Sequence, residues 1–343
     1  LYSRLTRHYG ALVGRAAAGL ADRPPQYLRA IARDAGIDID HCRWGLSAPG
    51  DYSHRKVLFF LFGPSTNSSM PGQHSTEQAG HRRTRESPEY IVKMVRDPIL
   101  NPRLENEYRA LSLLHEKGIG DRETLPQVVF FGHHSDLAIV GETAIDGTPF
   151  RQQTEATADC LYARAAIDWL IDLSAATASP TAATPEQVAG GLSKLFKRFV
   201  EIYRLTPEQH AFLTDRIMTI ARSQVAFPLV FQHGDPGTWN VMVTKSGRIA
   251  FLDWEAAEPQ GMPLWDLFYF MRSYCVGAAL ARGTRDRLEG FSQQFLAESP
   301  LSRLVVEATG RYCERIGLPG HLVEPLFYTC WMHRALKEAN RLT

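Results

Sequence analysis

Three polar residues stand close together in the stretch FQHGDPGTWNVMV, residues 231–243: His233, Asp235 and Asn240. Apolar runs precede and follow them, so the three side chains are expected on one short loop. An ordinary polar turn is one interpretation of this loop. The other is a catalytic loop, in which Asp235 acts as a base toward a hydroxyl group and Asn240 binds a metal ion.

A further carboxylate follows at the end of the next predicted hairpin. The runs VMV and IAFL flank the turn TKSGR, and Asp253 comes just past the second run, thirteen residues after Asn240. Because the two ends of a hairpin lie close together, Asp235, Asn240 and Asp253 are expected to converge. Carboxylate and amide oxygens suit Mg²⁺, which leaves coordination positions for phosphate oxygens.

These motifs resemble those of the aminoglycoside phosphotransferase and choline kinase-like family, whose fold is a divergent protein-kinase fold. HGDPGTWN keeps the His, Asp and Asn of the kinase loop H-R-D-x-x-x-x-N, with Gly in place of Arg. LDWE stands where protein kinases have DFG, and PLWDL, residues 263–267, looks like the family's structural aspartate segment. The resemblance implies a catalytic base at Asp235, Mg²⁺ ligands at Asn240 and Asp253, and a bracing role for His233.

A kinase-like site also needs a strand lysine for the α- and β-phosphates and a helix glutamate that holds this lysine. Lys93 lies in the otherwise apolar run YIVKMV, where an unpaired charge is costly. Glu107 lies on the following predicted helix, in the register of the family's glutamate. Glu105 is the rival, but it projects about 200° away around the helix. We therefore favour Glu107 as the partner of Lys93.

Two further segments are interpreted as nucleotide-binding by their order along the chain. The loop SAPGDYSHR, residues 47–55, fits a phosphate-covering loop, with Gly50 allowing close backbone approach and Ser53 donating to phosphate. An ordinary hairpin turn fits it nearly as well. GETAI, residues 141–145, falls where the family's hinge contacts adenine, which makes Glu142 and Ala144 candidate nucleotide contacts. Neither G-x-x-x-x-G-K-[ST] nor G-x-G-x-x-G occurs, which disfavours P-loop and dinucleotide-binding enzymes.

The order of predicted elements gives an α+β, bilobal, protein-kinase-like fold. Residues 1–41 are expected to form an N-terminal helical segment. Residues 42–145 are expected to form a small antiparallel β-sheet lobe with one central helix, which binds the nucleotide, and residues 146–343 a larger, mainly helical lobe for catalysis and acceptor binding. The active site is expected between the lobes. Residues 63–89 are polar and nearly free of large apolar side chains, which predicts a flexible loop.

Composition excludes several other classes of protein. A net charge of +1 gives no reason to expect a nucleic-acid partner, and no apolar run approaches the roughly 18 residues of a membrane span. The opening residues lack an initiator Met and the apolar core of a signal peptide, which suggests a trimmed chain. The five cysteines are scattered without C-x-x-C spacing, which indicates reduced thiols in a cytoplasmic protein.

We therefore predict an ATP- and Mg²⁺-dependent kinase that phosphorylates a hydroxyl of a small molecule. From residue 271 to the end, Lys and Arg outnumber Asp and Glu, which favours a sugar or another neutral or anionic acceptor. Aminoglycosides and choline or other amino alcohols are the alternatives within the family. A nucleotide-binding pseudokinase and a kinase acting on protein are alternatives of other classes. The sequence leaves the choice of ATP over GTP and the oligomeric state open.

Overall fold

The structure is a computed structural model that describes residues 21–48, 56–64, 87–223 and 227–342 of the 343-residue chain. The chain forms two compact units. The first comprises Leu1–Pro149 and Met242–Glu255, and the second comprises Phe150–Val241 and Ala256–Thr343.

The return segment Met242–Glu255 falls within the range 146–343 that was expected to form the second lobe. It groups with the first unit because β10 (Val241–Thr244) pairs antiparallel with β7 (Gly147–Pro149), and β11 (Ile249–Phe251) lies on the other side of β10. The predicted hairpin of β10 and β11 is therefore present, and it carries Asp253 into the first unit.

A six-stranded antiparallel sheet forms the centre of the first unit, with the strand order β1-β2-β3-β4-β6-β5. Its strands are β1 (Ala21–Asp22), β2 (Arg43–Ser47), β3 (Val57–Phe62), β4 (Tyr90–Met94), β5 (Val128–His134) and β6 (Leu137–Thr143). The strands β2 to β6 are those that the sequence predicted. Two residues of the range expected to be helical, Ala21 and Asp22, instead extend the sheet by pairing with β2.

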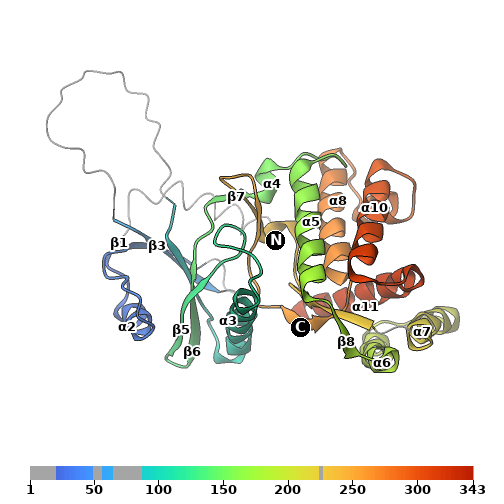
Figure 1. The fold of residues 1–343 in the computed structure, drawn as a ribbon, viewed down its shortest axis with the longest axis horizontal. Coiled ribbons are helices and arrows are strands. Elements are labelled where there is room, and N and C mark those ends of the chain that lie inside the picture. Colours follow the sequence, from blue (N-terminus) through green and yellow to red (C-terminus); the bar gives the residue numbers. More distant parts are fainter. Residues whose placement is uncertain (1–20, 49–55, 65–86, 224–226, 343) are drawn as a thin grey trace, which may run out of the picture. The chain divides into compact units, whose positions relative to one another are not determined.

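The apolar run of β3 is unbroken because both faces of the strand are buried: Phe60 and Phe62 cluster with Ile91 of β4 on one face, and the other face packs against a helix. Phe59 and Leu61 share a core with Leu28 of α2 (Gln26–Asp34). On the opposite face, Leu104 of α3 (Asn101–Glu116) packs with Val140 of β6. Figure 1 shows α2 and α3 on the two sides of these strands.

Local signals set the position of α3. Asp97 caps the preceding 3-10 turn by accepting the N–H of Ile99, and a proline follows at the start of α3. Gly118, with a φ of 67°, ends the helix in the left-handed region. The buried stripe of α3 includes one charged residue, Glu107. The register of this helix therefore points a carboxylate at the sheet.

The second unit is mainly helical. Its helices are α4 (Phe150–Gln153), α5 (Leu161–Thr177), α6 (Pro185–Ile202), α7 (Pro207–Ala221), α8 (Trp265–Ala281), α9 (Arg287–Phe295), α10 (Pro300–Ile316) and α11 (Val323–Leu342). Capping boxes begin α6 at Thr184 and α7 at Thr206. Helix α8 is buried around most of its circumference, as its apolar sequence requires, and it forms the core of this unit.

One small sheet in this unit did not follow from the sequence analysis. β9 (Phe227–Gln232) lies between β8 (Ser179–Ala183) and β12 (Glu258–Gly261), and both pairings are antiparallel. The apolar β9 thus has partners on both sides, and its end leads directly into the loop that begins at His233.

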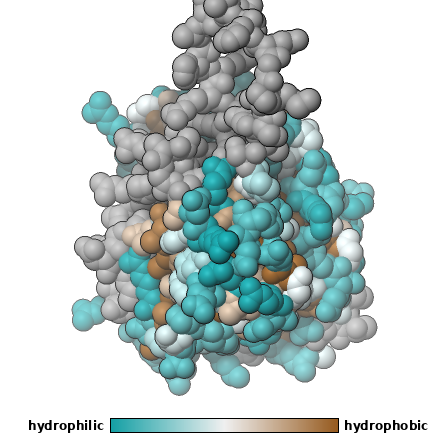
Figure 2. Space-filling model, turned by 90° about the vertical axis from the view of Figure 1, so that its left-hand side faces the viewer, coloured by the Kyte–Doolittle hydropathy of each residue, from teal (hydrophilic) through white to brown (hydrophobic). Residues whose placement is uncertain are grey.

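The face of the molecule drawn in Figure 2 is mostly hydrophilic, and apolar residues appear on it as small separate areas. Scattered exposed apolar residues of this kind are normal for a folded protein. Within the described residues, no helix is both long enough and apolar enough to cross a membrane.

Candidate active site

Lys93 of β4 and Glu107 of α3 form a buried ion pair in the first unit. Lys93 Nζ lies 2.6 Å from one carboxylate oxygen of Glu107 and 2.9 Å from one of Glu142, on β6. The pairing that the sequence favoured is therefore present. Glu105, the rival, has a side chain that is 40% exposed and lies 3.8 Å from the imidazole of His133.

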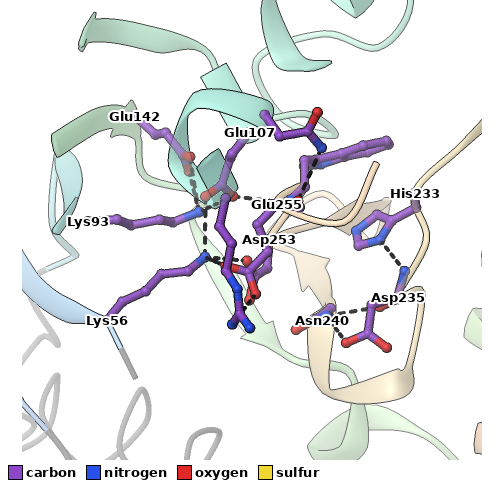
Figure 3. Close-up of polar contacts among 12 residues, drawn as sticks. Lys56, Lys93, Glu107, Glu142, His233, Asp235, Asn240, Asp253 and Glu255 are labelled. Atoms are coloured by element: carbon purple, nitrogen blue, oxygen red, sulfur yellow. Dashed lines mark hydrogen bonds and ion pairs between the residues drawn. The ribbon is translucent and has the colours of Figure 1, made fainter. Parts of the chain in front are cut away.

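A second lysine, Lys56, immediately precedes β3; it shares Glu107 with Lys93 and contacts two further carboxylates. Its Nζ lies 2.5 Å from Asp253, 3.0 Å from Glu255 and 3.3 Å from Glu107 (Figure 3). No sequence motif marked Lys56, because the residue merely precedes an apolar strand. Only the tertiary structure brings it to carboxylates as far as 197 residues away along the chain.

Asp253 follows β11 in an unusual backbone conformation. Its φ of 68° lies in the left-handed region, which Asp adopts more easily than most residues but still at a cost. The next residue anchors it: the N–H of Trp254 donates to Glu107 over 2.9 Å, and the indole N–H donates to the carbonyl of Phe251. Because Trp254 is fully buried, the backbone around Asp253 is fixed in place.

Carboxylates outnumber ammonium groups in this cluster, and the pKa shifts follow from that. For both lysines, burial alone would lower the pKa, but the carboxylates next to each Nζ outweigh burial and raise the pKa above its usual value. Burial and the charge of Glu107 raise the pKa of Glu142 to about 7, although Lys93 opposes this shift. Burial, Asp253 and Glu107 likewise raise the pKa of Glu255. The cluster is thus a site of excess negative charge.

In the second unit, Asp266 fixes the backbone of the predicted catalytic loop. Its carboxylate accepts the N–H of His233 over 2.5 Å and the N–H of Gly234 over 3.1 Å. This buried carboxylate has its pKa raised to about 7 by burial, against the effect of these two hydrogen bonds. Leu264, with a φ of 68°, turns the chain into α8 just before Asp266. The structural role that the resemblance implied for PLWDL is thus met by Asp266.

Within the loop, His233 braces the backbone, as expected. The fully buried imidazole accepts the N–H of Asp235 through Nδ1 over 3.2 Å. Asn240 donates to the carbonyl of Asp235 over 2.9 Å, and the indole N–H of Trp239 reaches the Asp235 carboxylate over 3.4 Å. Figure 3 shows the side chains of Asp235 and Asn240 close together on this loop.

Helix α11 adds two cations to the loop, and in the sequence both are only part of a basic C-terminal region. Arg334 donates to the carbonyl of Gly234 over 2.9 Å and to the carboxylate of Asp235 over 3.1 Å. Lys337, one helical turn later, donates to the same carbonyl over 3.1 Å. The guanidinium of Arg334 also lies 3.3 Å from the ring centroid of Tyr269. Arg334 and Lys337 are three residues apart, so they lie on the same face of the helix. This spacing is the sequence signal that could have identified them as two cations that act together.

The other predicted nucleotide contacts remain predictions. Gly50 and Ser53 lie outside the described residues. Glu142 points its side chain at Lys93, and the backbone N–H of Ala144 donates to the carbonyl of Glu89 over 2.9 Å. A hinge contact of Ala144 with adenine would therefore use its carbonyl oxygen rather than its N–H.

Comparisons with known proteins agree with these motifs. The profile of the Phosphotransferase enzyme family (APH) matches residues 75–298, which is more than half of the chain. The comparison with curated proteins found no match.

Many solved structures are similar to this chain at low identity, including an aminoglycoside phosphotransferase and a choline kinase. Aminoglycoside phosphotransferase APH(3'')-Id from Streptomyces rimosus, solved with ADP and streptomycin, is 14% identical with a TM-score of 0.46, over 89% of this chain and 96% of that one. Choline kinase LicA from Streptococcus pneumoniae is 14% identical with a TM-score of 0.34, over 85% of this chain and 94% of that one.

The family profile includes Lys93, Glu107, the loop with Asp235 and the hairpin that ends at Asp253. It thus covers the residues on which the kinase interpretation depends. The chain therefore belongs to the Phosphotransferase enzyme family, has its protein-kinase-like α+β fold, and is a phosphotransferase with a hydroxyl group as acceptor.

Proposed function

We propose that this protein is an ATP- and Mg²⁺-dependent kinase that transfers the γ-phosphoryl group to a hydroxyl of a small neutral or anionic metabolite, such as a sugar derivative. The assignment of a neutral or anionic acceptor rests on the contact of Arg334 and Lys337 with the loop of Asp235. The phosphoryl chemistry rests on family membership and on the two sets of polar residues described above.

Asp235 is assigned as the base that orients the acceptor's hydroxyl and accepts its proton. The ion pair with Arg334 and the hydrogen bonds of His233 and Asn240 to its backbone hold this residue in one orientation. Transfer of a phosphoryl group requires little covalent chemistry from the protein, so such positioning provides much of the rate.

Asn240 and Asp253 are assigned as the metal ligands, and the donor chemistry fits Mg²⁺. Both offer oxygen atoms, and Asp253 belongs to a cluster with excess negative charge. When bound, Mg²⁺ neutralises charge on the β- and γ-phosphates. Lys93, held by Glu107, is assigned to the α- and β-phosphates.

The charge around Asp235 distinguishes between classes of acceptor. A polycationic aminoglycoside calls for acidic side chains around the base. The buried carboxylate of Asp266 binds the backbone of this loop, but three basic side chains also contact the loop: Arg334 and Lys337 contact it directly, and Arg151 donates to Thr238 over 2.9 Å. This charge pattern supports a neutral or anionic acceptor over aminoglycosides and choline.

The test is a phosphoryl-transfer assay with MgATP and four acceptor classes: neutral sugars, sugar acids, aminoglycosides and choline. We expect transfer to a neutral or anionic sugar, and we expect Asp235→Asn to lower kcat by roughly a thousandfold. Asp215→Asn is the matched control, because Asp215 is an exposed carboxylate of the same unit that pairs with Arg216. Wild-type rates in Asp235→Asn would refute the assigned mechanism, and transfer to aminoglycosides alone would refute the acceptor class.

A further inference from the structure

Lys56 contacts three carboxylates with one ammonium group. An ammonium group has three N–H donors, and the Nζ of Lys56 lies within 3.3 Å of oxygens of three carboxylates: Asp253, Glu255 and Glu107. Its side chain is only 14% exposed. Lys93 already provides Glu107 with a partner at 2.6 Å, so Lys56 chiefly serves Asp253 and Glu255.

The charges of the cluster are unbalanced. Three cations face four carboxylates: Lys56, Lys93 and Arg103, whose guanidinium lies 3.8 Å from Glu255, face those of Glu107, Glu142, Asp253 and Glu255. With all groups ionised, one negative charge remains in excess, which favours the binding of a further cation.

Lys56 and a metal ion would compete for the same carboxylate oxygen of Asp253. The ammonium lies 2.5 Å from Asp253 Oδ1. Mg²⁺ binds carboxylate oxygen at about 2.1 Å, so a metal on this oxygen would lie less than about 5 Å from the ammonium. Two cations at this separation in a buried cluster repel each other strongly.

We propose that Lys56 is a surrogate cation: its ammonium holds Asp253 and Glu255 in place until a divalent cation takes over these carboxylates and displaces it. This role rests on the proposed function, because it takes Asp253 as a metal ligand. Lys56 is then a positioning residue that keeps the strained Asp253 ordered in the metal-free protein. Lys56 also weakens the binding of free metal ions. The metal is therefore taken up chiefly together with the nucleotide, whose phosphates neutralise part of its positive charge.

The test is a titration of the nucleotide-free protein with Mn²⁺, followed by the electron paramagnetic resonance signal of the free ion. We expect Lys56→Met to tighten Mn²⁺ binding by about tenfold or more, because the competing cation is gone. Lys56→Arg retains the charge and is expected to bind Mn²⁺ like the wild type. In Lys56→Met/Asp253→Asn the gain should disappear, because the metal loses its carboxylate.

Lys245→Met is the matched control. Lys245 pairs with Asp146 in the same unit, but its side chain is 74% exposed. Its removal is expected to leave Mn²⁺ binding unchanged. If Lys56→Met does not fold, Lys56→Gln, which retains N–H donors without the charge, replaces it in the titration.

Unchanged or weaker Mn²⁺ binding in folded Lys56→Met would overturn the proposal, and so would a gain that survives Asp253→Asn. No nucleotide or acceptor is present in this experiment. A failure of the proposed kinase activity would therefore leave the result intact. Conversely, an active kinase without the gain in Mn²⁺ affinity would refute only the role of Lys56.

Discussion

At the scale of single residues, this protein concentrates buried charge around Glu107. This side chain is fully buried and accepts contacts from Lys93, from Lys56 and from the N–H of Trp254. A buried carboxylate with three donors is costly to remove, because its partners are left uncompensated in an apolar environment. Exposed ion pairs lack this penalty, because water replaces the lost partner.

Glu107→Gln is therefore expected to lower the free energy of unfolding by about 3 kcal/mol. Glu105→Gln on the same helix is the control and should change it by less than about 1 kcal/mol, because Glu105 is partly exposed. Urea unfolding of both variants measures the difference. Equal effects at the two positions would show that the buried cluster does not contribute to stability.

His333 is expected to make the fold sensitive to acid. Its ring stacks on Trp265, and burial, with Lys337 and Arg334 nearby, lowers its pKa from 6.5 to about 3. In the unfolded chain the imidazole takes up a proton as the pH falls below 6.5, whereas in the folded protein it stays neutral until about pH 3. Stability linked to His333 is thus fully present above pH 6.5 and is lost progressively between pH 6.5 and 3.

Unfolding experiments across this pH range test the expectation. In His333→Gln the loss of stability toward low pH should be shallower than in the wild type. His321→Gln is the control, because His321 is exposed in the same unit. A pH dependence that is identical in wild type and His333→Gln would contradict the assigned role.

At the scale of elements, the loop between β9 and β10 is set by its neighbours rather than by its own sequence. Asp266 at the start of α8 holds the N–H groups of His233 and Gly234, and Arg334 of α11 holds the carbonyl of Gly234. Gly234 has a φ of 77°, and a Cβ there would overlap the carbonyl oxygen of Ala256. Only glycine therefore lets the loop approach this backbone.

Gly234→Ala is expected to destabilise the protein by about 3 kcal/mol or more, since it adds an overlap to left-handed strain. Gly247→Ala separates the two effects: Gly247 has a φ of 82° but no atom within 4 Å of the added Cβ, so only the strain of about 1 kcal/mol applies. Thermal unfolding of the two variants gives the comparison. A similar loss of stability in the two variants would mean that the chain relieves the overlap at position 234 without a cost in free energy.

At the scale of the whole molecule, the chain builds each unit from separated segments. The hairpin that ends at Asp253 belongs to the first unit, although it follows a segment of the second unit along the chain. Helices α8 to α11, which come after it, belong to the second unit again. Residues assigned to the nucleotide and its metal are thus drawn from β4, α3, the loop that carries Asn240 and the hairpin that ends at Asp253. Ligand binding should therefore stabilise the folded protein against global unfolding.

Thermal unfolding with ATP or GTP, each with and without Mg²⁺, measures this stabilisation. One nucleotide with Mg²⁺ is expected to add about 2.7 kcal/mol at a hundredfold excess over its Kd, and chelation of Mg²⁺ should remove most of it. In Asp253→Asn the Mg²⁺-dependent part should be absent. No shift with either nucleotide at millimolar concentration would contradict a working nucleotide site.

Much of the fold could be predicted from the sequence because its signals are local. Alternating and continuous apolar runs marked β2 to β6, glycine and proline marked the ends of α3, and the spacing of His233, Asp235, Asn240 and Asp253 marked the loop and hairpin. Even the choice of Glu107 over Glu105 needed only the rotation of a helix.

The tertiary structure alone decided which distant charges meet. Lys56 precedes an apolar strand, and Arg334 lies on the last helix. At neither position do the neighbouring residues in the sequence predict which carboxylate the side chain contacts. Their contacts with Asp253 and Asp235 depend on how β3 and α11 pack within their own units, and such packing is a property of the assembled core. The sequence thus determined the family and the residue types of its chemistry, while burial and long-range packing determined the charge that surrounds them.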